Sequence, residues 1–277
     1  MAPSLPNFGF SQGVTQRGFG LAQHAEVCHK LMLELGYPEY ITQGGDWGSY
    51  ITRLMGRRYP SSCKASHINM IEVTPPGWAS NPRLALRHAI LPYSESEKQG
   101  LQRTQWFLKE GRGYDIEQRT NPQTIGYALH DSPAALLAWI YEKLHNWTDS
   151  YPWSEDEILT WISIYCFSRA GPAASARIYY EVQHDRSDTR ARINTYDPNV
   201  RLGLAYSPRE LILAPKSWAR SLGPIVFMSD HENGGHFMAW EKPEALVGDL
   251  RIMFGRNGGA YGVVVGRDGF DSPRTSL

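Results

Sequence analysis

The sequence is poor in cysteine: its three cysteines, Cys28, Cys63 and Cys166, stand far apart in a chain of 277 residues. An odd number of scattered cysteines argues against a disulfide framework and against a metal site built from cysteine ligands. Such usage is typical of reduced thiols in an intracellular protein. We therefore expect a cytoplasmic location.

Long apolar runs and an excess of charge of one sign are also absent. No apolar stretch approaches the roughly 20 residues of a membrane helix, and the N-terminus lacks the apolar core of a signal peptide. Lys plus Arg and Asp plus Glu both number 28, so nothing indicates a nucleic-acid partner or an anionic membrane surface. The sequence contains no glycine-rich phosphate loop and no internal repeat. These absences leave an ordinary globular protein that is long enough for an ample core.

The stretch from Tyr40 to Tyr50 carries the most informative pattern. A β-prone run over residues 40–43 leads into Gly44-Gly45-Asp46-Trp47-Gly48, and a run with helical periodicity follows. A strand, a sharp turn and a helix are the context of a nucleophile elbow, with Asp46 in the place of the usual serine. The glycines relieve crowding in a turn that strains the backbone of its central residue. Asp46 is therefore a candidate nucleophile that forms an ester, and a plain Gly-Asp turn is the alternative.

The pattern changes three times along the chain and so predicts four parts. They are an N-terminal part of the core, a helical lid, a C-terminal part of the core and a Gly-rich tail, over residues 1–73, 74–195, 196–256 and 257–277. Within the lid, Ser132 and Ser154 carry the signals of helix N-caps. The tail is expected to be disordered or loosely packed. Strands and helices that alternate on both sides of a helical insertion predict an α/β protein with a mostly parallel sheet.

Residues that can assist Asp46 stand late in the chain. Glu210 and His236 each follow a predicted strand, at the edge where a parallel sheet presents its catalytic residues. The order of nucleophile, acid and histidine fits an α/β-hydrolase arrangement. Two glycines directly before His236 indicate a loop that can aim one imidazole into a site. His67, which lies inside a predicted strand, is interpreted as a packed histidine rather than a catalytic one.

Several motifs carry a resemblance to a known family. They are Leu5-Pro6-Asn7-Phe8-Gly9-Phe10-Ser11, Gln43-Gly44-Gly45-Asp46-Trp47-Gly48-Ser49, Asn69-Met70, Gly126-Tyr127-Ala128-Leu129-His130-Asp131-Ser132-Pro133, Pro208-Arg209-Glu210-Leu211, Pro215-Lys216-Ser217-Trp218 and Gly234-Gly235-His236-Phe237. On these motifs the chain resembles a fungal epoxide hydrolase of the microsomal type, from about Leu5 to about Met253. The resemblance implies an α/β-hydrolase fold with a helical lid inserted in a mostly parallel sheet. It also implies that the chain opens an epoxide to a vicinal diol, with secondary metabolism as the expected setting.

The resemblance assigns a role to each candidate residue. Asp46 is the nucleophile that forms an ester, His236 is the base that activates water, and Glu210 is the carboxylate that orients His236. The backbone N–H of Trp47, directly after the nucleophile, is a donor of the oxyanion hole.

The resemblance also implies two lid tyrosines that hydrogen-bond the epoxide oxygen, in keeping with the need of this poor leaving group for a proton donor. Tyr114 and Tyr179 occupy the matching positions, and Tyr180 is the alternative to Tyr179. No cofactor and no metal is required. The implied partners are a small apolar epoxide and water, with a homodimer left open and with peripheral attachment to the endoplasmic reticulum as the alternative location.

The chain departs from the family pattern at its N-terminus. It contains no His-Gly-x-Pro, the motif that supplies the other half of the oxyanion hole, and relatives carry about a hundred further residues there, including several strands. We therefore expect the strand over residues 40–43 to lie at an open sheet edge. A truncated gene model, a natural shortened relative with little activity and a piece that needs a partner remain open. Two other functions are weighed: a non-catalytic binding protein, and a hydrolase like the haloalkane dehalogenases, which share the ester chemistry.

Overall fold

The centre of the structure is one sheet of four parallel strands. In this computed structural model, residues 1–185, 187 and 189–267 are described. The strands are β1 (Tyr40–Gly44), β2 (Cys63–Ile68), β3 (Arg201–Tyr206) and β4 (Ile225–Asp230), and they pair in the order of the sequence. The predicted parallel sheet is confirmed. Within the described sheet β1 is an edge strand, as expected.

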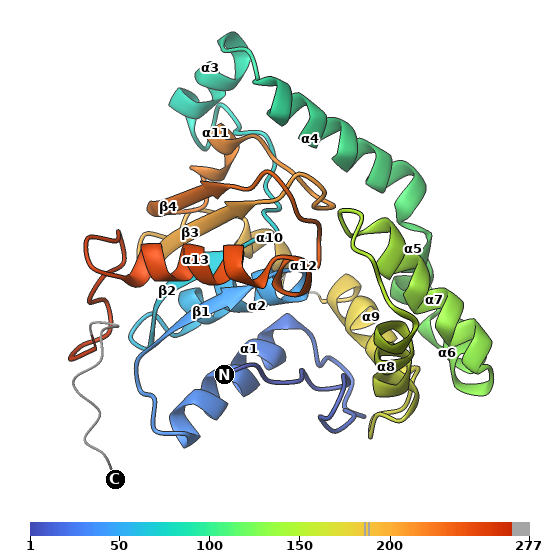
Figure 1. Cartoon of the computed structure of the whole chain (residues 1–277). Helices are drawn as coiled ribbons and strands as arrows, with labels where there is room; N and C mark the ends of the chain where they lie inside the picture. The colour runs from blue at the N-terminus through green and yellow to red at the C-terminus, as the bar shows by residue number, and fades with distance from the viewer. Residues whose placement is uncertain (186, 188, 268–277) are drawn as a thin grey trace.

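Helices from both ends of the chain pack against this sheet (Figure 1). Helix α1 (Leu21–Glu34) contacts α2 (Trp47–Arg58), which packs on β1 and β2, while α13 (Pro243–Phe254) packs on β3 and β4. Two short helices, α11 (Lys216–Ala219) and α12 (Met238–Glu241), lie in the C-terminal part.

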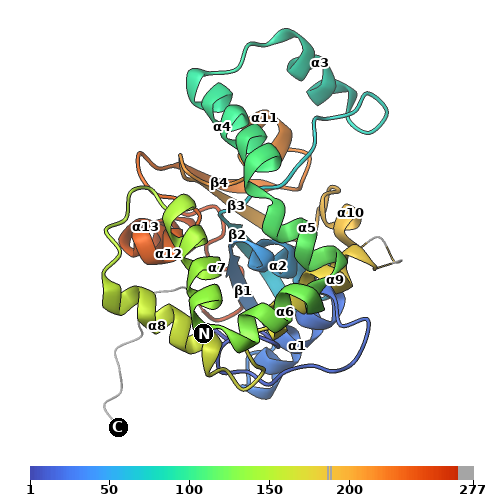
Figure 2. The same cartoon turned by 90° about the vertical axis from the view of Figure 1, so that its right-hand side faces the viewer.

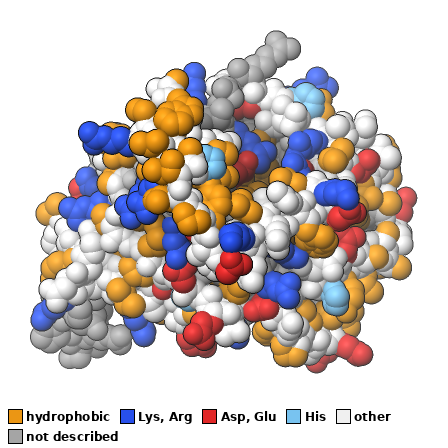
Figure 3. Space-filling model, turned by 90° about the horizontal axis from the view of Figure 1, so that it is seen from above, with side chains coloured by type: hydrophobic (Ala, Val, Ile, Leu, Met, Phe, Trp, Pro, Cys, Tyr) orange, Lys and Arg blue, Asp and Glu red, His pale blue; other side chains and the backbone are white. Residues whose placement is uncertain are grey.

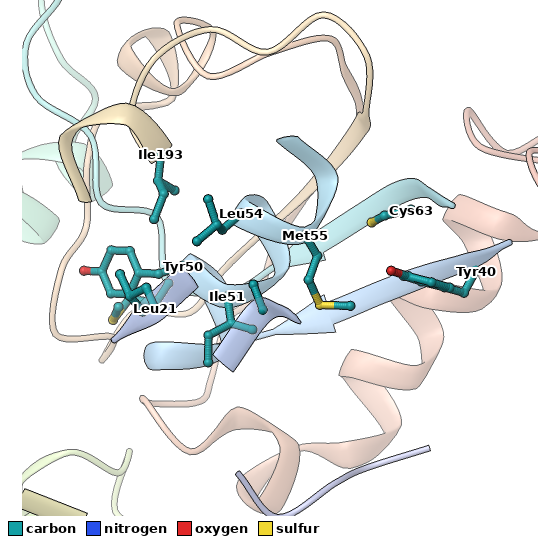
Figure 4. Close-up of a cluster of buried hydrophobic side chains, with 10 residues drawn as sticks. Leu21, Tyr40, Tyr50, Ile51, Leu54, Met55, Cys63 and Ile193 are labelled. Atoms are coloured by element: carbon teal, nitrogen blue, oxygen red, sulfur yellow. The ribbon is translucent and has the colours of Figure 1, made fainter. Parts of the chain in front are cut away.

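Apolar side chains of α1 and α2 form the largest buried cluster of this part of the molecule. Leu21, Ile51, Leu54 and Met55 recur at helical spacing and meet Tyr40 of β1 (Figure 4). Their burial is the main favourable contribution to folding, about 1.5–3 kcal/mol for each large side chain. The same packing fixes α2, whose first turn carries the elbow.

The segment between β2 and β3 is helical. Its elements are α3 (Pro82–Ile90), α4 (Glu95–Trp106), the π-helical turn η1 (Phe107–Gly111), α5 (Gly113–Thr120), α6 (Pro122–Asp131), α7 (Pro133–Asn146), α8 (Glu155–Cys166), the 3₁₀ turn η2 (Ala174–Ala176), α9 (Arg177–Gln183) and α10 (Thr189–Ile193). Ser132 caps α7, and Ser154 forms a capping box with Glu157 at α8, so both predicted caps are confirmed. Figure 2 shows α5, α6, α7 and α9 in front of the strands. None of the helices in the described part is long and apolar enough to cross a membrane.

The end of the molecule at which α3 lies carries exposed apolar side chains. Figure 3 looks down on this end and shows hydrophobic side chains gathered with Lys and Arg. Trp78, Leu86 and Ile90 are 62%, 50% and 66% exposed. Patches of this kind often serve as contact surfaces, but this one lies apart from the elbow.

Of two further interpretations of the sequence, the structure confirms one and contradicts part of the other. His67 is a fully buried residue of β2, 3.7 Å from Asp249 of α13, which confirms its interpretation as a packed histidine. The expectation of a loose tail is wrong for residues 257–267, because Ala260 is buried and packs with Met253. Residues 268–277 of the tail lie outside the described residues.

Candidate active site

The backbone of Asp46 has the strain expected of an elbow. Asp46 follows β1 and is the N-cap of α2, with φ 46° and ψ −130°. This backbone conformation costs a non-glycine residue about 1–3 kcal/mol and persists only where the surrounding structure imposes it. One constraint is the close approach of Gly44, where a Cβ would lie 2.3 Å from the carbonyl oxygen of Gly48. The turn therefore forces the Asp46 side chain outward.

The two oxygens of the Asp46 carboxylate have different partners. Oδ1 accepts a hydrogen bond from the backbone N–H of Trp47 at 2.5 Å, and Oδ2 lies 2.8 Å from His236 Nε2. The side chain is 43% exposed, so the carboxylate is not sealed in the core. It lies at the N-terminus of α2, the positive end of the helix dipole.

A buried carboxylate holds the other side of the imidazole. Glu210, in the loop after β3, lies with Oε1 2.6 Å from His236 Nδ1, and both side chains are almost completely buried. The same Oε1 accepts the backbone N–H of Leu211 at 2.7 Å. The structure thus brings together three residues that lie up to 190 positions apart in the sequence.

His236 is an imidazole between two carboxylates. Burial lowers its pKa, but Glu210 and Asp46 raise it more through charge and hydrogen bonding, and the result is a pKa of about 10. The imidazole is therefore protonated at neutral pH. Loss of the Asp46 charge removes one of these two causes.

The loop that carries His236 is fixed by acids and carbonyls from distant segments. The backbone N–H groups of Gly234, Gly235 and His236 donate in turn to Asp149 Oδ2 at 2.9 Å, Glu241 Oε1 at 3.1 Å and the carbonyl of Trp147 at 2.8 Å. A Cβ on Gly235 would lie 2.4 Å from that carbonyl, so only glycine fits this close approach. The aiming of His236 depends on the end of α7.

The two tyrosines face the same space as Asp46. The rings of Tyr114 in α5 and Tyr179 in α9 form an edge contact with centroids 5.9 Å apart, and Tyr179 also contacts Trp47. Burial, with the neighbouring Asp46, raises the pKa of both phenols, so both are neutral O–H donors at neutral pH. Tyr180 is 37% exposed and stacks on His184 instead. Of the two adjacent tyrosines, the structure places Tyr179 at the candidate site.

Two small cavities meet at Asp46, Tyr114 and Tyr179. One, of about 140 Å³, is mainly aromatic and is lined by Phe8, Trp139, Trp147, Trp161, Tyr165 and Phe237. The other, of about 90 Å³, has charged side chains that pair with each other, Glu72 with Arg190 and Asp115 with Arg112. A larger groove of about 680 Å³ at Phe10, Leu159 and Phe167 contains none of the candidate residues.

The arrangement brings a carboxylate, an imidazole and two phenols together in one place. Within the described residues, no group of three or more His, Cys, Asp or Glu side chains is arranged to hold a metal ion. The sequence did not identify four further residues that line the cavities, namely Lys143, Trp147 and the ion pair Glu72–Arg190. These positions look like ordinary helix or loop residues in the sequence, and no local signal marks them.

Comparisons with known proteins reveal relatives in sequence and in fold. Residues 1–127 match the family model of the alpha/beta hydrolase fold. The chain is 36% identical to a putative epoxide hydrolase of Stigmatella aurantiaca, over 91% of the chain and 55% of that protein. Solved structures that are similar include Aspergillus niger epoxide hydrolase (36% identity, TM-score 0.76, 90% of this chain and 60% of that one) and the juvenile hormone epoxide hydrolase of the silkworm Bombyx mori (31%, 0.80, 90% and 62%).

The chain has the α/β-hydrolase fold. Over the length that they share it is homologous to the epoxide hydrolases described above. Its relatives include bacterial, fungal and insect proteins, so the homology extends beyond the fungal members. The chain spans between 55% and 62% of the length of the three relatives described above.

Proposed function

We propose that the chain hydrolyses a small apolar epoxide to a vicinal diol through an ester on Asp46. The observation that carries this proposal is the convergence of an elbow carboxylate, His236 and two buried phenols on one pair of cavities. The substrates are the epoxide and water, and the chemistry needs no cofactor. The three free cysteines support the proposed cytoplasmic location.

In the first step, Asp46 Oδ2 attacks a ring carbon. A bond forms between Oδ2 and that carbon, the strained C–O bond breaks, and the epoxide oxygen takes a proton from Tyr114 or Tyr179. Oδ1, held by the N–H of Trp47, becomes the carbonyl oxygen of the ester. The aromatic cavity accommodates the apolar substituent of the epoxide.

Formation of the ester changes the charge beside His236. The ester is neutral, so the imidazolium loses one of its two anionic neighbours and its pKa falls. Its proton returns to the tyrosinate, and the imidazole, oriented by Glu210, becomes a base. It takes a proton from water as the water oxygen attacks the ester carbonyl.

The resulting oxyanion forms at Oδ1, where the N–H of Trp47 stabilises it. The tetrahedral species then breaks its bond to the diol oxygen. His236 passes the water-derived proton to that oxygen and takes up the proton of the Asp46 carboxyl group. The cycle ends with the carboxylate and imidazolium with which it began.

The experiment that tests this function is intact-mass measurement of the chain with styrene oxide. In His236→Ala we expect an added mass of one substrate that accumulates and maps to the Asp46 peptide, because ring opening proceeds without hydrolysis. Asp46→Asn should form no adduct. Folded protein without adduct in either the wild type or His236→Ala would favour a binding protein over an enzyme.

Substitution of Tyr179, with its neighbour Tyr180 as the control, distinguishes an epoxide hydrolase from a haloalkane dehalogenase. Tyr179→Phe should slow ester formation with the epoxide by about a hundredfold, since it removes an acid that the epoxide oxygen needs. The matched control Tyr180→Phe should leave the rate unchanged. Halide release from a haloalkane at a rate indifferent to Tyr179→Phe would support the dehalogenase instead.

A further inference from the structure

A buried lysine lines the aromatic cavity, and the steps above do not use it. Lys143 belongs to α7, its side chain is only 9% exposed, and it shares the cavity with Asp46 and Tyr114. Lysine is almost never buried without a partner, because its charge loses hydration there. The partners of Lys143 therefore indicate what the charge does.

The ammonium of Lys143 lies between two aromatic rings and one surface carboxylate. Nζ is 4.9 Å from the ring centroid of Tyr114 and 4.5 Å from that of Trp139. Both distances are within the range of a cation–π interaction. Nζ also lies 2.7 Å from Glu142 Oε1, whose side chain is 58% exposed. The exposed carboxylate supports the charge from outside, while the charge itself faces the rings inside.

The other groups around Tyr114 oppose negative charge on its phenol. Burial raises the pKa of Tyr114, and Tyr179, Asp46 and Asp115 raise it further. Arg112 and Arg119 do not offset this directly, because both pair with Asp115. Lys143 is a cation that contacts the face of the Tyr114 ring.

We propose that Lys143 is a positioning residue that polarises Tyr114, so that Tyr114 donates a stronger hydrogen bond to the epoxide oxygen. As the proton moves toward that oxygen, the phenol gains negative charge, and a cation on the ring face attracts this charge more than it attracts the neutral ring. This role rests on the proposed function, since Tyr114 must donate to the substrate. It goes further by adding a residue of α7 to the site.

The test is a double-mutant cycle with Lys143→Met and Tyr114→Phe. Methionine is an unbranched side chain of similar length and helix propensity to lysine, but it carries no charge. Phenylacetamide serves as an uncharged probe, because its carbonyl oxygen accepts a hydrogen bond as the epoxide oxygen does. We expect Lys143→Met to weaken phenylacetamide binding about fivefold when Tyr114 is present, and to leave it unchanged in the Tyr114→Phe background. Ester formation with styrene oxide should slow about five- to tenfold, again only with Tyr114 present.

Two further variants separate polarisation from a structural brace. Lys143→Arg should retain most of the probe binding, because a guanidinium also stacks on aromatic faces. Glu142→Gln should bind the probe as well as or better than the wild type, because it leaves the cation less neutralised. If the ion pair only braces α7, Glu142→Gln should instead behave like Lys143→Met.

The outcomes also distinguish this role from the proposed function. An equal loss of probe binding with and without the Tyr114 hydroxyl overturns the role of Lys143, as does failure of the wild type to bind the probe. Coupling in probe binding without any ester from styrene oxide keeps the polarisation of Tyr114 by Lys143 and rejects the hydrolase. Should Lys143→Met fail to fold, Lys143→Arg and Glu142→Gln still decide, since the brace and the polarising charge predict opposite results for Glu142→Gln.

Discussion

At the scale of single residues, the candidate site depends on how one proton is shared. His236 lies 2.6 Å from Glu210 and 2.8 Å from Asp46, and both carboxylates favour its charged form. Such an imidazolium cannot act as a base until one carboxylate loses its charge. The proposed ester would supply that loss, and Asp46 and His236 are coupled by electrostatics as well as by position.

Asp46→Asn removes the negative charge beside His236, as formation of the neutral ester does. We expect the pKa of His236 to fall below about 10, because the amide removes the charge of Asp46 but keeps its size. NMR titration of the His236 ring resonances measures the change. Below the lower pKa the imidazole should stay protonated in both proteins, and between the two pKa values only the variant should be neutral.

Asp249→Asn is the matched control for that titration. Asp249 pairs with His231 at 2.8 Å and not with His236, so the pKa of His236 should stay where it is in the wild type. An unchanged pKa of His236 in Asp46→Asn would contradict the electrostatic coupling.

At the scale of elements, the loop after β4 depends on the helical segment for its shape. Consecutive backbone N–H groups of this loop donate to Asp149, Glu241 and the carbonyl of Trp147. Buried N–H groups that lose such partners cost about 1–3 kcal/mol each. The end of α7 therefore helps to position His236, besides lining the cavity.

Gly235→Ala tests this contact between the loop and α7. The added Cβ would meet the Trp147 carbonyl at 2.4 Å and Glu241 at 2.9 Å, so the loop must shift. We expect the free energy of unfolding in urea to fall by about 1–3 kcal/mol. Gly248→Ala, in α13 with open space at its Cβ, is the control and should raise stability by up to about 1 kcal/mol. A Gly235→Ala chain as stable as the wild type would argue against a tight contact.

At the scale of the whole molecule, buried polar contacts join distant parts of the chain. Arg53 of α2 is buried and donates to the carbonyls of Ile193, Thr195 and Leu222 at 2.9–3.3 Å. These partners lie 140–169 positions away from Arg53. One side chain thus connects the elbow helix to the end of the helical segment and to the chain before β4.

Arg53→Met should lower the free energy of unfolding by about 3 kcal/mol, because it leaves buried carbonyls without a donor. Among the described residues Arg57 donates only to Thr195, in a solvent-exposed hydrogen bond, and Arg57→Met should cost less than about 1 kcal/mol. Urea unfolding of the two variants measures the difference. Equal losses would mean that the buried contacts of Arg53 add nothing to stability.

The sequence by itself determined the local features of this protein. The elbow with Asp46, the helix caps at Ser132 and Ser154, and the parallel strands follow from residue spacing, glycine content and capping chemistry, which act between near neighbours. Family motifs extended this reading to Glu210, His236 and the tyrosines. The packed His67 also followed from its place within a strand.

Only the tertiary structure decided the features that depend on contacts between distant segments. The tail expectation failed for residues 257–267 because Ala260 meets Met253 in the fold, a contact that composition does not encode. The sequence does not distinguish Tyr179 from Tyr180. The packing of α9 places Tyr179, and not Tyr180, in the cavity with Asp46. Lys143 carries no local signal because its partners come from α5 and its own helix surface. Burial and charge at the site are set by which elements pack together, and that is decided by the whole chain.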